Sequence, residues 1–306
     1  MASPQEVLAK GKTKIIYKVE GGGHVFSKND MTAFNGKRHK EIPGKGAWST
    51  TVTSNIFAAF AACHLPVAFY EQVDEQTFFA PVVQMLPFEV VVRRYARGSV
   101  ITTHGVADGR RFEKLPVQIF LKTSDCRVGN ITLPQDDMLV TRIRTDGVEV
   151  SRVDCLLRSE PPIFVQWQEI SSFVGPMPFT KMQRLARQGF LLLEDLWRMQ
   201  GLDLQDCKFE FGLSHNSTLL FADVIDPDSW RLRDELGRSY DKDPFRNIED
   251  LDEAVAAIER IYPLLAKCSG EFEIPGLRAQ AKAYMNTRME RQCLLPDEIE
   301  TATAAT

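Results

Sequence analysis

Residues 206–212, with the sequence DCKFEFG, alternate between charged and apolar side chains. A period of two residues is typical of a β-strand, in which successive side chains point to opposite faces of the sheet. A second stretch, residues 219–231 (LLFADVIDPDSWR), is apolar as far as Asp223 and then becomes rich in carboxylates. A fold that contains both stretches has to bury their apolar faces and still accommodate acidic groups beside them. The charged face is either solvated, which is ordinary, or it lines a site.

The composition is that of a globular protein without a global attraction for polyanions. The chain has 306 residues, of which 44% are hydrophobic and 25% are charged, and this length fits two domains or one domain split into lobes. The formal net charge of −4 gives no indication of binding to nucleic acid or to a membrane surface. Any cationic patch is therefore local, which favours a small anionic ligand.

The cysteines and histidines exclude several common kinds of site. The six cysteines form neither a CxxC pair nor a zinc-like spacing, and the five histidines have no HExxH or triad-like context. Scattered cysteines behind an N-terminus too polar for a signal peptide favour the reducing cytoplasm. No apolar run approaches the ~20 residues needed to span a bilayer.

Periodicity predicts an α+β fold in which strands dominate the first part of the chain. Residues 11–30 have the pattern of a β-hairpin with a glycine-rich turn, and residues 105–162 that of loops with short strands. Amphipathic patterns predict helices at four places: residues 48–65, 179–201, 247–268 and 276–293.

A division into two lobes is expected near residues 84–87, where a strand meets a proline and a hinge is plausible. The N-terminal lobe, residues 1–86, would be β-rich. The larger α+β lobe, residues 87–306, would carry the acidic strands and the C-terminal helices.

Lysines alternate near the N-terminus in the sequence KGKTK, which contains Lys10, Lys12 and Lys14 beside Gly11. A glycine between lysines lets backbone N–H groups and ammonium groups approach phosphate oxygens. The alternative is a solvated lysine face on an edge strand, which five such residues in isolation favour.

Two carboxylates, Glu210 and Asp223, lie near the ends of the two predicted strands. Mg²⁺ is a hard cation that binds through one or two carboxylates together with substrate phosphates. These acids therefore form a candidate Mg²⁺ site; a pair of exposed acids, or an acid paired with Lys208, is an equal alternative.

Arginines form a third group of candidates. The sequence RRYARGS places Arg93, Arg94 and Arg97 before Ser99, and Arg231 follows closely after Asp228. The arginine fork matches phosphate geometry, and a Gly-Ser turn can complete such a site. Surface charge is the alternative, as it is for Lys242 and Arg246 in the sequence YDKDPFR.

Together these motifs resemble those of the SAICAR synthetase family of purine biosynthesis, and most closely its animal-type members. The matching stretches follow the family's order and are GKTKIIY, SKNDMTAFNGK, EVVVRRYARGS, DCKFEFG, ADVIDPDSWRL and DKDPFR. The resemblance covers most of residues 8–100 and 206–247. It implies a two-lobed α+β fold with ATP between the lobes, and an ATP- and Mg²⁺-dependent ligase joining the carboxylate of CAIR to the amine of L-aspartate. A homo-oligomer is compatible with it.

The resemblance also implies a role for each candidate residue. Gly11, Lys12, Lys14 and Met85 would bind ATP, and Glu210 and Asp223 would hold the metal. Anchoring of the ribose phosphate of CAIR would fall to Arg93, Ser99 and Arg231. The pocket for the imidazole carboxylate would be lined by Asp206, Lys208 and Asp228, with Lys12, Lys208 and Asp206 closest to the chemistry. Nearby anions would be met by Lys242 and Arg246.

Residues 123–180 follow the family poorly. Lys122 leads into TSDCRVGNITLPQDD, where the family's Asp-Pro segment is missing, and Asn35 stands where many bacterial members have Asp. This divergence keeps open a related ATP-dependent amide ligase with another amine or carboxylate substrate. With L-aspartate as the amine, Arg127 would replace the anchoring that the missing Asp-Pro segment provides. A non-catalytic nucleotide-binding paralogue is the other alternative; the lysines, acids and arginines named above argue against it.

Overall fold

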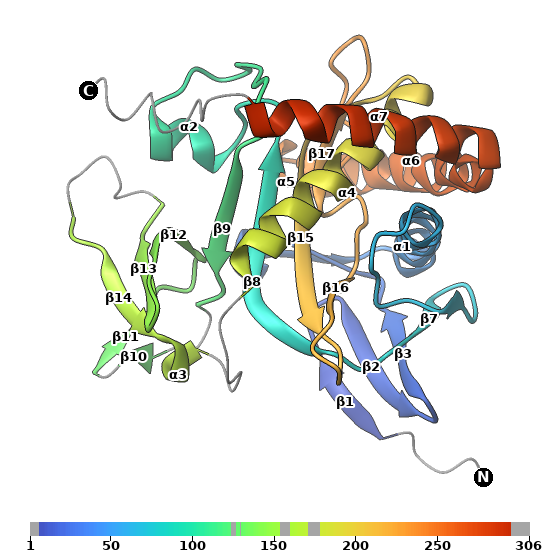
Figure 1. The fold of residues 1–306 in the computed structure, drawn as a ribbon. Coiled ribbons are helices and arrows are strands. Elements are labelled where there is room, and N and C mark those ends of the chain that lie inside the picture. The colour runs from blue at the N-terminus through green and yellow to red at the C-terminus, as the bar shows by residue number, and fades with distance from the viewer. Residues whose placement is uncertain (1–5, 124–126, 129, 154–159, 171–177, 295–306) are drawn as a thin grey trace.

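An antiparallel sheet of eight strands forms the centre of the protein (Figure 1). The computed structural model describes residues 6–123, 127–128, 130–153, 160–170 and 178–294. The strand order is β14-β13-β12-β9-β8-β15-β16, and β17 also pairs with β15. The strands of this sheet are β8 (Gln84–Arg93), β9 (Val117–Leu121), β12 (Met138–Ile143), β13 (Gly147–Ser151), β14 (Ile163–Gln166), β15 (Asp203–Leu213), β16 (Leu219–Ala222) and β17 (Trp230–Arg233).

A smaller sheet from the N-terminal part of the chain lies beyond one end of β8 and β15 (Figure 1). Its order is β1-β2-β3-β7-β6, all antiparallel, and two hairpins, β4-β5 and β10-β11, stand apart from both sheets. The bounds of these strands are β1 (Val7–Lys10), β2 (Lys14–Val19), β3 (Gly22–Ser27), β4 (Asp30–Ala33), β5 (Arg38–Glu41), β6 (Glu71–Gln72), β7 (Thr77–Ala80), β10 (Arg127–Val128) and β11 (Ile131–Thr132).

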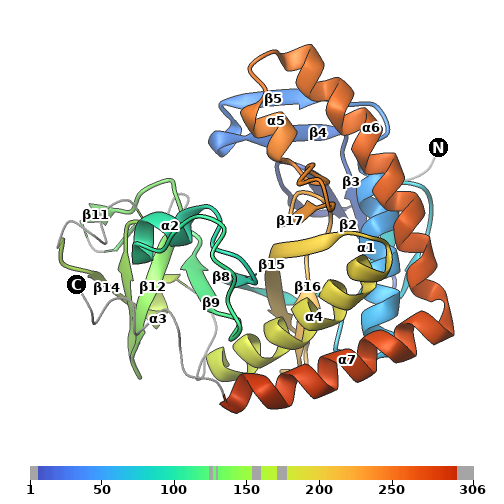
Figure 2. The same cartoon turned by 90° about the horizontal axis from the view of Figure 1, so that it is seen from above.

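Helices cover one face of the large sheet, as Figure 2 shows from above. Helix α4 packs on β15, β8 and β9, α7 packs on α4, and α1 packs on α6. The helices are α1 (Lys45–Ala62), α2 (Ser99–His104), α3 (Trp167–Ile170), α4 (Phe179–Met199), α5 (Asp243–Asn247), α6 (Leu251–Ser269) and α7 (Pro275–Leu294), with 3₁₀ turns η1 (Phe34–Gly36) and η3 (Gly270–Glu273). None of the helices in the described ranges is long and apolar enough to cross a membrane.

Strand β15 is covered on both faces. Its apolar side chains, Cys207, Phe209 and Phe211, are at most 1% exposed and belong to the main hydrophobic core. Close packing against α4 depends on Gly189, because a Cβ there would lie 2.9 Å from the ring of Phe221 on β16. The predicted aromatic face is therefore confirmed, and the opposite face carries the charged positions.

Most predicted elements are confirmed. The hairpin at 11–30 is β2-β3, and the four predicted helices correspond to α1, α4, α6 and α7. Gly201, just after α4, has a φ of 76°, a left-handed conformation that favours glycine at a helix end. The region 105–162 is more regular than expected, since β9, β12 and β13 belong to the large sheet.

The expected hinge at residues 84–87 lies inside β8, which runs across it without a break. Met85 pairs with Gly212 of β15, and Phe88 pairs with Leu121 of β9. The proline is tolerated within a long strand whose other residues supply the ladder hydrogen bonds. The division into residues 1–86 and 87–306 stays a prediction, because no break in the chain marks it.

Candidate active site

A polar cleft of about 470 Å³ lies between the charged face of the large sheet and segments of the N-terminal part of the chain. Its side chains come from β2, β4, η1, β8, β15 and the segments around β17 and α5. Of the predicted site residues, the cleft is lined by Lys12, Lys14, Arg93, Asp206, Lys208, Asp223, Asp228, Arg231, Lys242 and Arg246. Residues more than 200 positions apart in the sequence therefore meet in one place.

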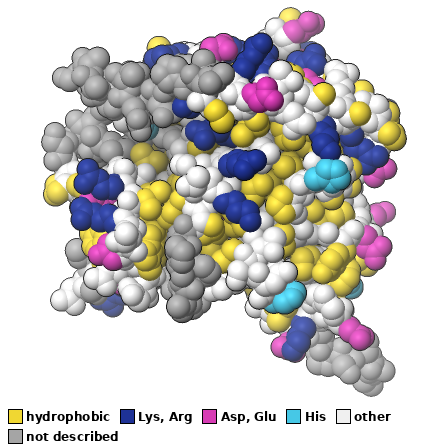
Figure 3. Space-filling model, viewed as in Figure 1, with side chains coloured by type: hydrophobic (Ala, Val, Ile, Leu, Met, Phe, Trp, Pro, Cys, Tyr) yellow, Lys and Arg dark blue, Asp and Glu magenta, His cyan; other side chains and the backbone are white. Residues whose placement is uncertain are grey.

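A larger hollow of about 1,410 Å³ lies between strands β9 and β12 and helices α4 and α7. Figure 3 views the molecule from the side of α4 and α7, where basic side chains are scattered among hydrophobic ones. Glu290 is the one carboxylate among the described residues that line this hollow. The larger hollow therefore lacks the paired acids and bases that line the polar cleft. We take the polar cleft as the candidate active site.

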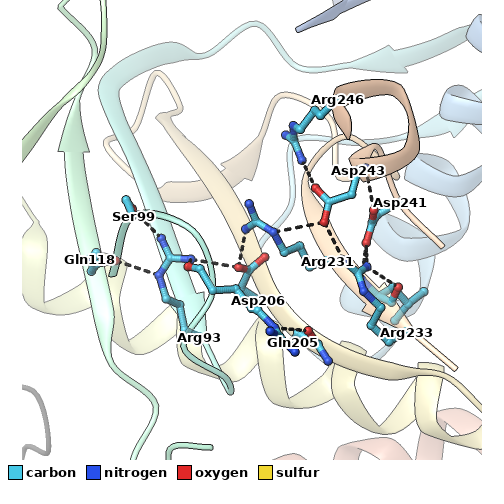
Figure 4. Close-up of polar contacts among 12 residues, drawn as sticks. Arg93, Ser99, Gln118, Gln205, Asp206, Arg231, Arg233, Asp241, Asp243 and Arg246 are labelled. Carbon is cyan, nitrogen blue, oxygen red and sulfur yellow. Dashed lines mark hydrogen bonds and ion pairs between the residues drawn. The ribbon is translucent and has the colours of Figure 1, made fainter. Parts of the chain in front are cut away.

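Strand register determines which charges meet in the cleft. Asp206 on β15 stands opposite Arg93 on β8 and opposite Arg231 on β17. The Asp206 Oδ2 atom accepts hydrogen bonds from Arg93 Nη1 at 2.9 Å and from Arg231 Nη1 at 2.7 Å (Figure 4). One buried carboxylate thus holds two guanidinium groups side by side, an arrangement suited to a dianionic phosphate.

The rest of the Arg93 guanidinium is fixed by neutral oxygens. Nε donates to Gln118 Oε1 at 2.8 Å, and Nη2 donates to Ser99 Oγ at 3.1 Å. Gly98, which precedes Ser99, has a φ of 62°, and a Cβ at this position would lie 3.1 Å from Arg231 Nη2. The predicted Gly-Ser turn is therefore in contact with both arginines, although Ser99 itself does not line the cleft.

Acidic side chains support Arg231 and Arg246 from the other side. Asp243 Oδ2 lies 3.5 Å from Arg231 Nε, and Asp243 Oδ1 accepts from Arg246 Nη1 at 2.8 Å (Figure 4). The expected surface ion pair of Arg246 is thus a half-buried link to Arg231.

Lys208 joins two carboxylates on the same face of the sheet. Its Nζ lies 2.8 Å from Glu89 Oε1 and 3.2 Å from Glu210 Oε1, and Glu210 also contacts Lys122. Burial opposes ionisation of Lys208 and of Glu210. The charges of Glu89 and Glu210 nevertheless raise the pKa of Lys208 well above its usual value. Burial is likewise outweighed at Glu210, whose pKa the lysine charges lower to about 2. Both groups are charged at neutral pH.

Lys14 lies close to both predicted metal ligands: it contacts Asp223, and the charge of Glu210 acts on its pKa. Asp223 lines the cleft directly after β16, whereas Glu210 on β15 does not line it. Asp223 has a φ of 62°, an uncommon conformation for a residue other than glycine, and its carboxylate contacts Lys14. Burial lowers the pKa of Lys14 to about 8. Among the described residues no group of three or more His, Cys, Asp or Glu side chains forms a metal site by itself.

A buried cluster around the predicted residue Asp228 contains two residues that the sequence did not reveal, Lys45 and Tyr262. Lys45, at the start of α1, is 2% exposed and its Nζ lies 3.3 Å from Asp228 Oδ2. Lys242 Nζ lies 3.3 Å from the same oxygen, and Tyr262 donates its hydroxyl to Asp228 Oδ1 at 2.6 Å. The only sequence signal was a lysine at the start of an apolar helix, which is too common to single out.

Four predicted site residues do not line the cleft: Gly11, Met85, Ser99 and Glu210. Met85 is 40% exposed on β8, and the exposed Gly11 donates its backbone N–H to Lys14 O at 2.9 Å. Glu210 lies behind Lys208 and does not line the cleft directly. Glu89 and Asp137 do line it and were not predicted.

The sequence profile of SAICAR synthetase matches residues 7–152 and 160–261. The chain belongs to the SAICAR synthetase family. Among SAICAR synthetase relatives, the phosphoribosylaminoimidazole-succinocarboxamide synthase of Chloroflexus aurantiacus is 30% identical, with 87% of this chain and 96% of the relative covered. The Caenorhabditis elegans relative, named "Probable multifunctional protein ADE2", is also 30% identical over 87% of this chain, which spans 59% of that protein.

Solved SAICAR synthetase structures have the same fold. The enzyme of Ehrlichia chaffeensis superposes with a TM-score of 0.63 at 24% identity, covering 84% of this chain and 98% of the other. A SAICAR synthetase solved in complex with ADP superposes with a TM-score of 0.62 at 23% identity, covering 84% and 97%. The predicted family and the two-lobed α+β fold class of that family are confirmed.

Replacing Tyr262 by Phe tests the cluster around Asp228. The change removes a hydrogen bond to a buried ionised carboxylate, which lowers the free energy of unfolding by about 1.5–3 kcal/mol. Urea denaturation measures the difference. Tyr240→Phe is the matched control, because its hydroxyl lies 3.4 Å from Asp234 Oδ2 and this variant loses about 0.5 kcal/mol or less. Equal stability of the Tyr262→Phe variant and the parent protein would contradict this account.

Proposed function

We propose that the chain is a phosphoribosylaminoimidazole-succinocarboxamide synthase. It joins the carboxylate of CAIR to the amine of L-aspartate at the expense of ATP, giving SAICAR, ADP and phosphate in de novo purine biosynthesis. The observation that carries this proposal is the charged face of β8 and β15: a doubly bridged arginine pair lies on the same face as a lysine–carboxylate group. Family membership and the cytoplasmic setting expected from the scattered cysteines agree with it.

The chemistry requires such a face. A carboxylate is a poor acylating agent, because oxide is a very poor leaving group. Transfer of the γ-phosphoryl group of ATP to the carboxylate of CAIR gives an acyl phosphate, from which phosphate leaves when the amine attacks. Several anions have to approach one another in this sequence, and fixed cations that stabilise them lower the barrier mainly by positioning and electrostatics.

At the nucleotide end, Gly11, Lys12, Lys14 and Met85 would bind ATP. Lys12 and Lys14 line the cleft at the end of the N-terminal hairpin, where ammonium groups reach phosphate oxygens. The pKa of Lys14, lowered by burial to about 8, still leaves most of this group charged at pH 7.

Glu210 and Asp223 fit an Mg²⁺ ion. Both carboxylates lie close to Lys14, which contacts Asp223 and whose pKa responds to the charge of Glu210, and the low pKa of Glu210 keeps this group ionised over the whole working range. Two carboxylates with substrate phosphates and water are a usual donor set for this cation. When bound, Mg²⁺ would neutralise charge on the phosphoryl group in transfer.

At the other end, Arg93, Ser99 and Arg231 would hold the ribose phosphate of CAIR. The guanidinium groups of Arg93 and Arg231 both donate to Asp206, so they are oriented before a ligand binds. Little side-chain entropy is therefore lost on binding. Between the two ends, Asp206, Lys208 and Asp228 would contact the imidazole carboxylate. Cations for the two carboxylates of aspartate would come from Lys208, Lys242 and Arg246.

The main alternative is a related amide ligase that uses the same nucleotide and metal machinery on another amine. The expectation that residues 123–180 follow the family poorly is wrong for most of this segment, because the family profile matches as far as residue 152 and again from residue 160. The alternative therefore rests only on local differences such as Arg127 on the short hairpin β10-β11. A non-catalytic nucleotide-binding paralogue is disfavoured, because the paired lysines, acids and arginines are all present in the cleft.

The purified protein, given ATP, Mg²⁺ and CAIR, forms SAICAR when L-aspartate is added. Mass spectrometry identifies the product, and ADP release gives the rate with aspartate, alanine, asparagine or glutamate. Aspartate gives the highest rate, because its side-chain carboxylate can bind to the cations that line the cleft, an interaction that the side chains of alanine and asparagine cannot make. Faster turnover with another amino acid would favour the related ligase. Nucleotide binding without ADP release for any amine would favour the non-catalytic paralogue.

Loss of either metal ligand lowers kcat. Glu210→Gln and Asp223→Asn each remove a charged oxygen while keeping side-chain shape, and each lowers kcat on the order of 10²-fold or more, as for other groups that stabilise transition-state charge. Titration with Mg²⁺ under saturating ATP and CAIR measures the effect. The exposed acids Glu290 and Asp252 supply the controls Glu290→Gln and Asp252→Asn, which keep the parent rate. Full activity of both variants, Glu210→Gln and Asp223→Asn, at limiting Mg²⁺ would contradict the assignment of these residues as metal ligands.

Replacing Arg231 by Ala weakens CAIR binding selectively. Losing a charge-assisted hydrogen bond costs about 1.5–3 kcal/mol, which corresponds to a rise in KM for CAIR of roughly 10- to 100-fold. The KM for ATP stays near its parent value, because the nucleotide binds at the other end of the cleft. Arg238→Ala, which removes an exposed arginine, is the control. An unchanged KM for CAIR would rule out the phosphate anchor.

A further inference from the structure

Asp137 lines the polar cleft and lies within the stretch 7–152 that the family profile matches. It immediately precedes β12, and its Oδ1 atom accepts the backbone N–H of Thr123 at 3.2 Å. Because Thr123 closely follows β9, this hydrogen bond ties Asp137 to the large sheet. The side chain is half-buried.

The charged groups around Asp137 come from each neighbouring strand. Glu89 faces it from β8, Lys122 from the end of β9 and Lys208 from β15. The adjacent Asp136 is exposed and contacts Asn35 of η1. Asp137 is thus the acid next to the central lysine–carboxylate group that has no close cationic partner among its described contacts.

Burial, followed by the charge of Glu89, raises the pKa of Asp137 to about 6, against the opposing effects of the Thr123 N–H group and of Lys122 and Lys208. Glu210 and Asp228 behave differently. Both acids are buried, yet the charges of nearby lysines lower the pKa of Glu210 and of Asp228. Neither acid therefore takes up a proton near neutral pH. Asp137 is ionised at pH 7 and binds a proton readily, which is the property of an effective general base.

The proposed ligation needs such a base. At neutral pH the amine of an amino acid is an ammonium group without a lone pair, and it cannot attack an acyl phosphate until it loses a proton. Lys208 is itself protonated, since its pKa lies well above its usual value through the effects already described, and the pKa of Glu210 is too low for it to hold the proton.

We propose that Asp137 is the general base that takes the proton from the ammonium group of the amine substrate. The inference rests on the proposed function and adds a catalytic residue to it. The Asp137 carboxylate accepts one N–H proton, and the freed nitrogen lone pair forms the C–N bond to the acyl carbon. The C–O bond to phosphate then breaks, phosphate leaves with the electron pair, and a second N–H proton leaves with it as hydrogen phosphate.

Hydroxylamine separates proton transfer from every earlier step. It is unprotonated at neutral pH, so it intercepts an acyl phosphate as a hydroxamate without needing a base. In the Asp137→Asn variant, SAICAR formation from aspartate falls on the order of 10²- to 10⁴-fold, the usual contribution of a general base. Hydroxamate formation from ATP, CAIR and hydroxylamine stays within about 3-fold of the parent rate, because ATP, Mg²⁺ and CAIR still bind. Asp136→Asn, a change in the adjacent exposed acid, keeps both rates.

The pH profile gives a second readout. The Asp137 carboxylate is ionised at pH values above its pKa of about 6. The rate of SAICAR formation from aspartate therefore falls as the pH drops through this value, whereas hydroxamate formation does not depend on the base. In the Asp137→Asn variant the residual rate shows no inflection near pH 6. An acid limb that is unchanged in the variant would overturn the proposal.

Three other outcomes would also overturn it. Parent-like SAICAR formation by Asp137→Asn means that another group takes the proton. An equal fall in SAICAR and hydroxamate formation, or a raised requirement for Mg²⁺, means that Asp137 acts in metal binding or phosphoryl transfer. If the parent protein forms neither product, the proposed function fails, and the role of Asp137 fails with it.

Discussion

Strand β15 has to be buried on both faces, and only one of those faces is apolar. Its aromatic side packs under α4, where burial of hydrophobic area stabilises it in the usual way. On its other side, Asp206, Lys208 and Glu210 can be buried at tolerable cost only if each meets an opposite charge. Asp206 meets Arg93 of β8 and Arg231 of β17, and Lys208 meets Glu89 of β8. Glu210 is paired with Lys208 on its own strand and with Lys122, which follows β9. The pairing of the central sheet is therefore also what builds the cleft.

These ion pairs preorganise the cleft for charged ligands. In the proposed reaction the charges are already desolvated and oriented, so a ligand exchanges partners with them and does not have to bury new ones. Mg²⁺ would take the place of Lys14 beside Asp223, which would free Lys14 for phosphate oxygens. A ribose phosphate would join Asp206 as a second anion between two arginines. Sites of this kind lose little free energy to reorganisation when the ligand arrives.

Local patterns in the sequence predicted the elements, and they could not predict the partners. The period-two alternation gave β15 and the direction of its charged face, because burial on one side imposes that period. Lys45 escaped notice, because a lysine becomes functional only when α1 carries it against Asp228, 183 positions further along the chain. Asp137 was missed for a related reason: weak periodicity around it hid β12, and its pKa is raised by burial and then by the charge of Glu89 on another strand.

Strand β8 also sets the distance between the two proposed ligand positions. It runs unbroken from Met85, at the proposed nucleotide end, to Arg93, at the proposed phosphate end, and the eight residue steps between them, at ~3.3 Å each, separate the two ends by about 26 Å. Glu89, Val91 and Arg93 share the cleft face because they are two residues apart. Inserting or deleting one residue would turn every side chain beyond it to the opposite face. The spacing between the two ligand positions can therefore drift in evolution only in steps of two residues, or not at all.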